Sequence, residues 1–266
     1  MSIYSVNGKE PIAAWIESLD PESVISSKAT DLVGANHGTL TNMDLTADPD
    51  TARRSDTASG GVRALVSDGV NDRVDFGNNF SFERTESFSV SMWTKFTSTA
   101  ANVPLLTKLQ NSPPFRGWSI EGDAGKVRLY FISTFGSSYI QKYSGASVNS
   151  GDWNHIVVTY DGSSSSSGVN FYVNGLLSNG STMANNLTTT TISSVSMQLF
   201  ARDAQLNASV RSDDVRIFDQ VLDLTDAEYL YANGFGRGIV AAATGKKRPR
   251  INGSLINSGL CRSSAL

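Results

Sequence analysis

Short β-strand patterns follow one another from Ser67 to Gly234, and this run constrains the fold more than any other feature of the chain. Apolar and polar residues alternate in segments such as 87–96 and 126–132, and Gly, Asn, Asp and Ser separate these segments. Alternation with a period of two indicates strands that bury one face and expose the other. Many such strands at short spacing predict an all-β, antiparallel, two-sheet sandwich.

The alternation also predicts which side chains form the core. In the segments 87–96 and 126–132 the core-facing side chains are expected to be Phe88, Val90, Met92, Val127, Leu129 and Phe131. Trp153 and Phe171 belong to two later segments joined by the serine-rich loop 161–168. Both sit among apolar neighbours, so we expect them to be core residues in adjacent strands.

A short helix is indicated after the last strand. Thr225 and Glu228 have the spacing of a capping box, in which two side chains satisfy free backbone amides at a helix start. Leu230 and Tyr231 follow, and Gly234 suits the end of the helix. Because so short a helix is marginal alone, we expect it to dock on the sandwich.

The chain changes character after residue 234. Residues 235–266 are rich in Gly and Ala and include a lone cysteine, Cys261, so no disulfide forms within one chain. They carry six basic and no acidic side chains: Arg237, Lys246, Lys247, Arg248, Arg250 and Arg262. The rest of the chain holds 16 basic and 25 acidic side chains, a net charge of −9. We expect one sandwich domain over 1–234 and an extended basic arm over 235–266 that contacts an acidic surface.

Five motifs in this order resemble the concanavalin A-like lectin/glucanase superfamily, and within it the laminin-G-like (LamG type 3) modules. The motifs are residues 31–39, Asp68–Gly77, Trp153–Gly162, Phe171–Gly175 and Asp213–Glu228. The chain departs from the family pattern at Arg73, where the family has an aromatic residue, and at Asn174, where it has Asp. The resemblance implies a jelly-roll sandwich. It does not imply one function, since the fold hosts lectins, hydrolases, adhesion modules and bacteriophage virion proteins.

A hydrolase on this fold needs paired carboxylates that act on one glycosidic bond. The closest match to the expected Glu-x-Asp-x-x-Glu pattern is Glu121, Asp123 and Lys126, in which lysine replaces the last carboxylate. Gly122 and Gly125 indicate that this segment is a turn between two strands. We therefore predict that the chain is not an enzyme and requires no cofactor.

Calcium is the metal that the aspartates of the first and last motifs favour, because carboxylate oxygens suit this hard cation. The candidate ligands are Asp68, Asp72, Asp213 and Asp214, and their two motifs are expected to meet across the sandwich. Related modules often hold one such ion. The alternative, which we favour, is that these side chains end strands and cap turns.

Exposed aromatic rings are candidates for stacking on a sugar ring. The tryptophans lie in strand-like segments and are mostly expected in the core. Phe115 and Trp118, beside Pro113–Pro114, are expected to be the most exposed aromatic pair and are the candidate carbohydrate-binding residues. His37 and His155 are expected to be structural residues rather than ligands.

The basic run 246–250 has no interleaved aromatic residue, so we expect no specific nucleic-acid partner. No apolar run is long enough to span a membrane, and the first ten residues lack the pattern of a signal peptide. We therefore expect a virion structural or decoration protein of a tailed bacteriophage, assembled in the host cytoplasm. It would display the lectin-like sandwich, and the arm would anchor it to other virion proteins or to copies of itself. The alternative is a glycan-binding lectin or adhesion module at a host or cell surface, exported without a signal.

Overall fold

A computed structural model describes residues 4–17, 27–44, 53–56 and 62–234. In this part of the chain the strands form two large antiparallel sheets and one two-stranded ribbon, and a single α-helix follows them. The predicted all-β antiparallel sandwich with one short C-terminal helix is therefore confirmed. The predicted arm, residues 235–266, lies outside the described residues.

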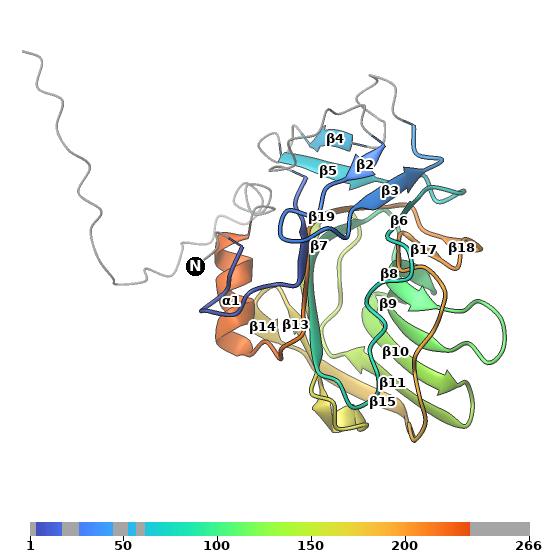
Figure 1. Ribbon diagram of the computed structural model, residues 1–266. Coiled ribbons are helices and arrows are strands. Elements are labelled where there is room, and N and C mark those ends of the chain that lie inside the picture. The colour runs from blue at the N-terminus through green and yellow to red at the C-terminus, as the bar shows by residue number, and fades with distance from the viewer. Residues whose placement is uncertain (1–3, 18–26, 45–52, 57–61, 235–266) are drawn as a thin grey trace, which may run out of the picture.

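Each large sheet mixes strands from distant parts of the sequence (Figure 1). Sheet I contains, in spatial order, β14 (Leu176–Leu177), β13 (Val169–Val173), β12 (Trp153–Tyr160), β7 (Phe88–Phe96), β19 (Val210–Phe218), β5 (Val62–Val66) and β4 (Arg53–Asp56), with β1 (Ala13–Trp15) also paired to β19. Sheet II contains, in spatial order, β15 (Asn179–Asn185), β11 (Ser138–Ser144), β10 (Lys126–Thr134), β9 (Gly117–Asp123), β8 (Val103–Leu109), β16 (Gln198–Leu199), β6 (Arg73–Asp75), β3 (Gly38–Thr41) and β2 (Lys28–Ala29). The ribbon pairs β17 (Ala201–Arg202) with β18 (Leu206–Asn207), and the helical elements are η2 (Ser166–Gly168) and α1 (Leu224–Asn233).

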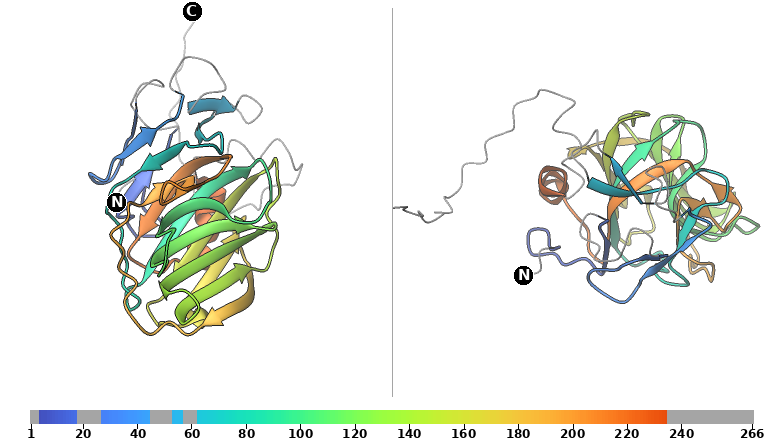
Figure 2. Two further views of the ribbon diagram at one scale, coloured as in Figure 1. Left: turned by 90° about the vertical axis from the view of Figure 1, so that its right-hand side faces the viewer. Right: turned by 90° about the horizontal axis from the view of Figure 1, so that it is seen from above.

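The sheets and the helix form three layers. Helix α1 lies on the side of sheet I that faces away from sheet II (Figure 1). The left view of Figure 2 looks onto the outer face of β8 to β11, which no helix covers. Helix α1 therefore covers part of one outer face of the sandwich (Figure 1). On the outer face of sheet II the ribbon β17–β18 packs on β8, where the Thr107 hydroxyl donates to the carbonyl of Ala201 at 2.6 Å.

The predicted alternation is confirmed in the core between the sheets. All six predicted core residues of β7 and β10 are buried in one cluster: Phe88, Val90, Met92, Val127, Leu129 and Phe131. The ring of Phe88 stacks on that of Phe82 with a centroid distance of 4.5 Å and an interplanar angle of 7°. Burying apolar surface contributes about 25 cal/mol per Å² removed from water, so this cluster is the main source of stability.

Trp153 and Phe171 are both buried, in adjacent strands β12 and β13, as predicted. They lie on opposite faces of sheet I. Phe171 belongs to the core between the sheets, whereas Trp153 packs with Ala64, Trp93 and Tyr231 in a separate small cluster.

The N-terminal segment is tied to the sandwich by the buried carboxylate of Asp31. Its Oδ1 accepts hydrogen bonds from the backbone amides of Ala14 (3.0 Å) and Val33 (3.1 Å), and its Oδ2 accepts from the amide of Asn36 (3.1 Å). A Cβ at Gly34 would lie 2.9 Å from the Asp31 Oδ2 atom. The Asp-x-x-Gly spacing of this motif is thus required by the close approach of the loop to the carboxylate.

The N-cap of helix α1 lies two residues earlier than predicted. Its N-cap is Asp223 rather than Thr225, and the capping box is completed by Asp226 rather than Glu228. The Asp223 side chain accepts from the Asp226 amide at 3.0 Å, and the Asp226 side chain accepts from the Asp223 amide at 2.9 Å. Asp226 is also bound by Lys9 and Asn7 from the N-terminal segment, contacts that local sequence spacing does not reveal.

The end and the docking of α1 follow the prediction. The amide of Gly234 donates to the carbonyl of Leu230 at 2.7 Å and ends the helix. Ala227 and Leu230 are buried against sheet I in one cluster with Val157 and Phe218. The apolar face of α1 therefore stabilises a helix that is too short to be stable alone.

His155 lies on β12 in the layer closed by α1. Its ring centroid is 5.1 Å from that of Trp93 and 6.1 Å from that of Tyr231, and its Nε2 is 3.0 Å from the Ser91 hydroxyl. Burial lowers the pKa of His155 to about 3, although the nearby Asp214 carboxylate acts in the opposite direction. The structural role predicted for His155 agrees with this neutral, buried ring.

Replacing His155 with glutamine should reduce the sensitivity of the fold to acid. Above the usual histidine pKa of 6.5 the ring is neutral in the folded and unfolded chain. As the pH falls from there toward about 3, only the unfolded chain gains the proton, so stability is lost in this window. Between about pH 7 and about pH 5 the loss should be about 2 kcal/mol.

Urea unfolding of the wild-type and His155→Gln proteins at about pH 5, 7 and 8 measures this effect. The interval from about pH 7 to 8 is the internal control, because there His155 is largely neutral in both states. Equal losses in both proteins between about pH 7 and 5 would contradict the assignment.

Candidate functional site

The outer face of β9, β10 and β11 carries a continuous polar and aromatic surface. Because Trp118, Ile120 and the apolar residues of β10 point into the core, the residues between them point outward. The strand register places Glu121 opposite Arg128 and Ser119 opposite Tyr130. Outward side chains of three neighbouring strands are thus brought to contact distance.

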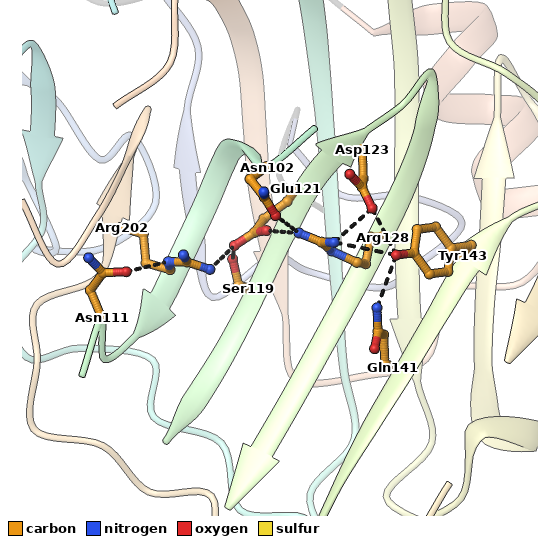
Figure 3. Close-up of polar contacts among 9 residues, drawn as sticks. All are labelled: Asn102, Asn111, Ser119, Glu121, Asp123, Arg128, Gln141, Tyr143 and Arg202. Carbon is orange, nitrogen blue, oxygen red and sulfur yellow. Dashed lines mark hydrogen bonds and ion pairs between the residues drawn. The ribbon is translucent and has the colours of Figure 1, made fainter. Parts of the chain in front are cut away.

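Arg128 is the centre of this surface (Figure 3). Its Nη2 donates to Glu121, and its Nη1 donates to the Asp123 carboxylate at 2.7 Å and to the Tyr143 hydroxyl at 3.3 Å. The guanidinium carbon lies 4.3 Å from the centroid of the Tyr130 ring, a cation–π geometry. Burial opposes the charge, but the adjacent Glu121 carboxylate and the Tyr143 hydroxyl raise the pKa of Arg128, which stays protonated.

The Glu121 carboxylate is buried and saturated with donors. Its Oε1 accepts from the Ser119 hydroxyl at 2.6 Å and from Arg202 Nη1 at 3.1 Å, while its Oε2 accepts from Arg128. Arg202 comes from the distant strand β17, and its Nε donates to the Asn111 side chain at 3.1 Å. Two guanidinium groups thus compensate the buried negative charge, and the carboxylate has no solvent access.

An aromatic group lies beside this polar network. Phe135, in the turn between β10 and β11, is 48% exposed, and its ring centroid is 5.1 Å from that of Tyr139, 5.9 Å from that of Phe115 and 6.1 Å from that of Tyr130. The loop before β9 is held against this turn, because the amide of Phe135 donates to the carbonyl of Pro114 at 3.1 Å. Phe135 meets Phe115 and Tyr130 edge to face, with interplanar angles of 71° and 74°, so the rings form an apolar wall whose most exposed member is Phe135.

The polar network and the aromatic group border an open pocket of about 160 Å³. The pocket is lined by Asn102, Leu109, Phe115, Tyr130, Ile132, Phe135 and Arg202. Ligand sites for whole small molecules usually measure about 300–1,000 Å³. The pocket therefore suits one ring of a longer ligand.

The two predicted carbohydrate-binding residues lie in different environments. Phe115 lines the pocket, whereas Trp118 is 1% exposed and belongs to the core between the sheets, so its expected exposure was wrong. Trp118 pairs with Lys108 on the core-facing side of β9 and β8, and its indole N–H donates to the carbonyl of Phe80 at 2.8 Å. One step in register separates the outward position from the inward one.

The four candidate calcium ligands do not form a site in the described structure. Asp213 accepts from the amides of Glu17 and Asp214, and burial raises its pKa well above the usual value, which favours the protonated form. Asp214 is held in an ion pair by Arg216. Within the described ranges, no three His, Cys, Asp or Glu side chains gather to hold a metal ion.

Asp68 and Asp72 stabilise the loop before β6. The Asp68 amide donates to Asp72 Oδ2 at 3.0 Å, and the Asp68 side chain accepts from the Val70 amide at 2.7 Å. These contacts agree with the alternative prediction, that Asp68 and Asp72 cap turns. Calcium binding stays a prediction that no contact in the described residues supports.

The residues that sequence reasoning missed are Arg128, Tyr130, Phe135 and Arg202. The first two had a signal, since they alternate with the predicted core residues of β10. No local sequence pattern indicated Arg202, because its partner Glu121 is 81 residues away in the chain.

The structure is a two-sheet, lectin-like β-sandwich with an aromatic pocket on sheet II. The Laminin_G_3 family model, described as the concanavalin A-like lectin/glucanases superfamily, matches residues 68–227. The chain belongs to this family. No curated protein matches the chain by sequence.

Solved structures with low sequence identity share the fold. Trypanosoma rangeli sialidase in complex with the inhibitor DANA matches with a TM-score of 0.57 and 13% identity over 86% of this chain and 33% of that chain. The binding domain of Botulinum neurotoxin DC, in complex with rat synaptotagmin II, matches with a TM-score of 0.54 and 18% identity over 86% and 52%. The binding domain of Paraclostridial Mosquitocidal Protein 1 matches with a TM-score of 0.55 and 17% identity over 82% and 51%. The chain thus spans between one third and about one half of these structures. In the described part, no helix has the length and apolar character of a membrane span.

Replacing Glu121 with alanine should lower the free energy of unfolding by about 3–5 kcal/mol, because it leaves the buried Arg128 without its main counter-charge. The matched control is Asp152→Ala, which removes an exposed carboxylate and should change stability by less than about 0.5 kcal/mol. Urea unfolding of both variants measures the difference. Equal stability of the two variants would show that the network does not hold the face together.

Proposed function

We propose that this chain is a non-enzymatic carbohydrate-binding module whose ligand lies on the outer face of β9, β10 and β11. The observation that carries the proposal is the aromatic wall of Phe115 and Phe135 beside polar side chains held in a fixed network. A sugar ring has an apolar face of C–H groups and a rim of hydroxyl groups. The aromatic wall suits the apolar face of the sugar. The amide of Asn102 and the guanidinium of Arg202 suit its hydroxyl groups.

The rigidity of this surface supports binding. Arg128 and Glu121 are fixed by several partners each, so little side-chain freedom remains to be lost when a ligand arrives. Two of the similar structures are, by their names, the binding domains of larger toxins, which supports an adhesion-type role for such a sandwich.

The same geometry argues against hydrolysis as the function. Glycoside cleavage needs one carboxylate that attacks and one that donates a proton. Glu121 is blocked by Arg128 and Arg202, and Asp123 accepts from Arg128 and from the Tyr143 hydroxyl at 2.8 Å. We therefore keep the prediction that the chain is not an enzyme.

Replacing Phe135 with alanine should weaken oligosaccharide binding about tenfold, because it removes the exposed part of the wall. The side chain is 48% exposed, so the fold should be retained. Tyr229→Ala is the matched control, since Tyr229 is an aromatic residue of 44% exposure on α1, away from sheet II. Titration calorimetry with oligosaccharides selected on a glycan array measures both variants. Similar affinities for the two variants would exclude the pocket as the binding site.

We also propose that the module is carried on a virus particle, as a decoration protein of a tailed bacteriophage. The six positive charges of residues 235–266 support this role, because they are complementary to the net charge of −9 on the rest of the chain and to other acidic virion proteins. Sugar binding and display on a particle are compatible, since a displayed lectin-like sandwich can attach a particle to a host surface.

Deleting residues 235–266 should leave the melting temperature of the sandwich unchanged and abolish incorporation into particles. Particles purified from cells that produce the full-length or the truncated chain give the occupancy of each. A variant with alanine at Lys246, Lys247 and Arg248 tests whether charge is the attaching force. Normal occupancy of the truncated chain would refute the anchoring role.

A further inference from the structure

The side chains that line the pocket offer hydrogen-bond donors and no carboxylate. Arg202 is the charged group among them. Its Nε and Nη1 donate to Asn111 and Glu121, and no described residue accepts a hydrogen bond from its Nη2. Asn102 is engaged through its Oδ1 by Arg128, so its amide N–H groups likewise have no acceptor in the described structure.

The acidic groups beneath the pocket are satisfied from within the sheet. Glu121 accepts from Ser119 and two arginines, and Asp123 accepts from Arg128 and Tyr143. Neither carboxylate therefore needs a donor from a ligand. The pocket thus presents unused N–H donors to a ligand, and those of Arg202 carry a positive charge.

The polar and aromatic side chains line one small pocket, whose volume suits one ring with one substituent. Arg202 and Phe135 both line the same pocket of about 160 Å³, with the Tyr130 ring between the polar network and the aromatic group. A guanidinium with two free N–H groups matches a carboxylate better than it matches a hydroxyl group, because the contact is charge-assisted.

We propose that the pocket selects a carboxylated sugar, a uronate, whose ring packs on Phe135 and whose carboxylate accepts from Arg202 Nη2. This inference rests on the proposed function and names its ligand class. The exposed ring of Phe135 favours a sugar over an acidic peptide, since a glutamate side chain brings the carboxylate without a ring to cover Phe135. Arg202 is thus the specificity-determining residue.

Matched pairs of oligosaccharides test the role of the carboxylate. Tri-galacturonate and a hyaluronan tetrasaccharide are each compared with the methyl-esterified form, which keeps the rings and linkages and removes the charge. A glutamate-rich peptide is the third probe. In titration calorimetry with the full-length chain, at least one acid form should bind about 10- to 100-fold more tightly than its ester.

Arg202→Gln should abolish this preference. Arg116→Gln should leave it within about twofold, because Arg116 flanks Phe115 without lining the pocket and donates to the carbonyl of Ser133. Since Arg202→Gln also removes a partner of Glu121, the double variant Arg202→Gln/Glu121→Gln is measured beside it, and circular dichroism checks the fold of each.

Four results would overturn the inference. Equal affinity for acid and ester forms, or equal losses in the Arg202 and Arg116 variants, would reject the uronate and leave sugar binding in place. Binding of the glutamate-rich peptide alone would reject both the uronate and the carbohydrate module. Binding of none of these probes, together with a blank glycan array, would also reject both.

Discussion

The alternation of β10 is the constraint on which both the core and the candidate site depend. Val127, Leu129 and Phe131 point into the core between the sheets, which leaves Arg128 and Tyr130 on the outer face. A shift of one residue in register would bury the guanidinium among apolar side chains and expose the core. The apolar packing therefore fixes the position of the polar network as firmly as it fixes the core, and the candidate site is a direct consequence of the sandwich.

Burial of Glu121 sets what this face can do. A buried carboxylate is stable only when its charge is compensated, and here Arg128 and Arg202 supply that compensation from two different strands. The compensation removes the free carboxylate that hydrolysis requires and holds the surrounding side chains in place. The same interaction thus supports the proposed binding role over hydrolysis, since a rigid, donor-lined surface can bind a ligand with little loss of conformational entropy.

The two outer faces of the sandwich differ because α1 covers one of them. Under the helix, His155 and Trp93 are sealed in a layer where burial keeps the imidazole neutral. No described helix covers sheet II along β8 to β11 (Figure 2). The half-exposed Phe135 and the pocket lie on that sheet. Helix docking through Ala227 and Leu230 thus leaves one face of the molecule available for recognition.

Local patterns in the sequence were sufficient for the fold class, the core side chains of β7 and β10, the burial of Phe171 and the end of α1 at Gly234, because alternation and helix-stop signals act within a few residues. They were not sufficient for the N-cap, because Asp223 and Thr225 each precede an acidic residue by three positions and both fit a capping box. In the structure Asp226, the partner of Asp223, also binds Lys9, more than two hundred residues away. The site shows the same division: Phe115 could be predicted as a pocket residue, but the burial of Trp118 follows from its strand register. The contact of Arg202 with Glu121 joins residues 81 positions apart, and only the folded arrangement of β17 beside β8 and β9 brings them together.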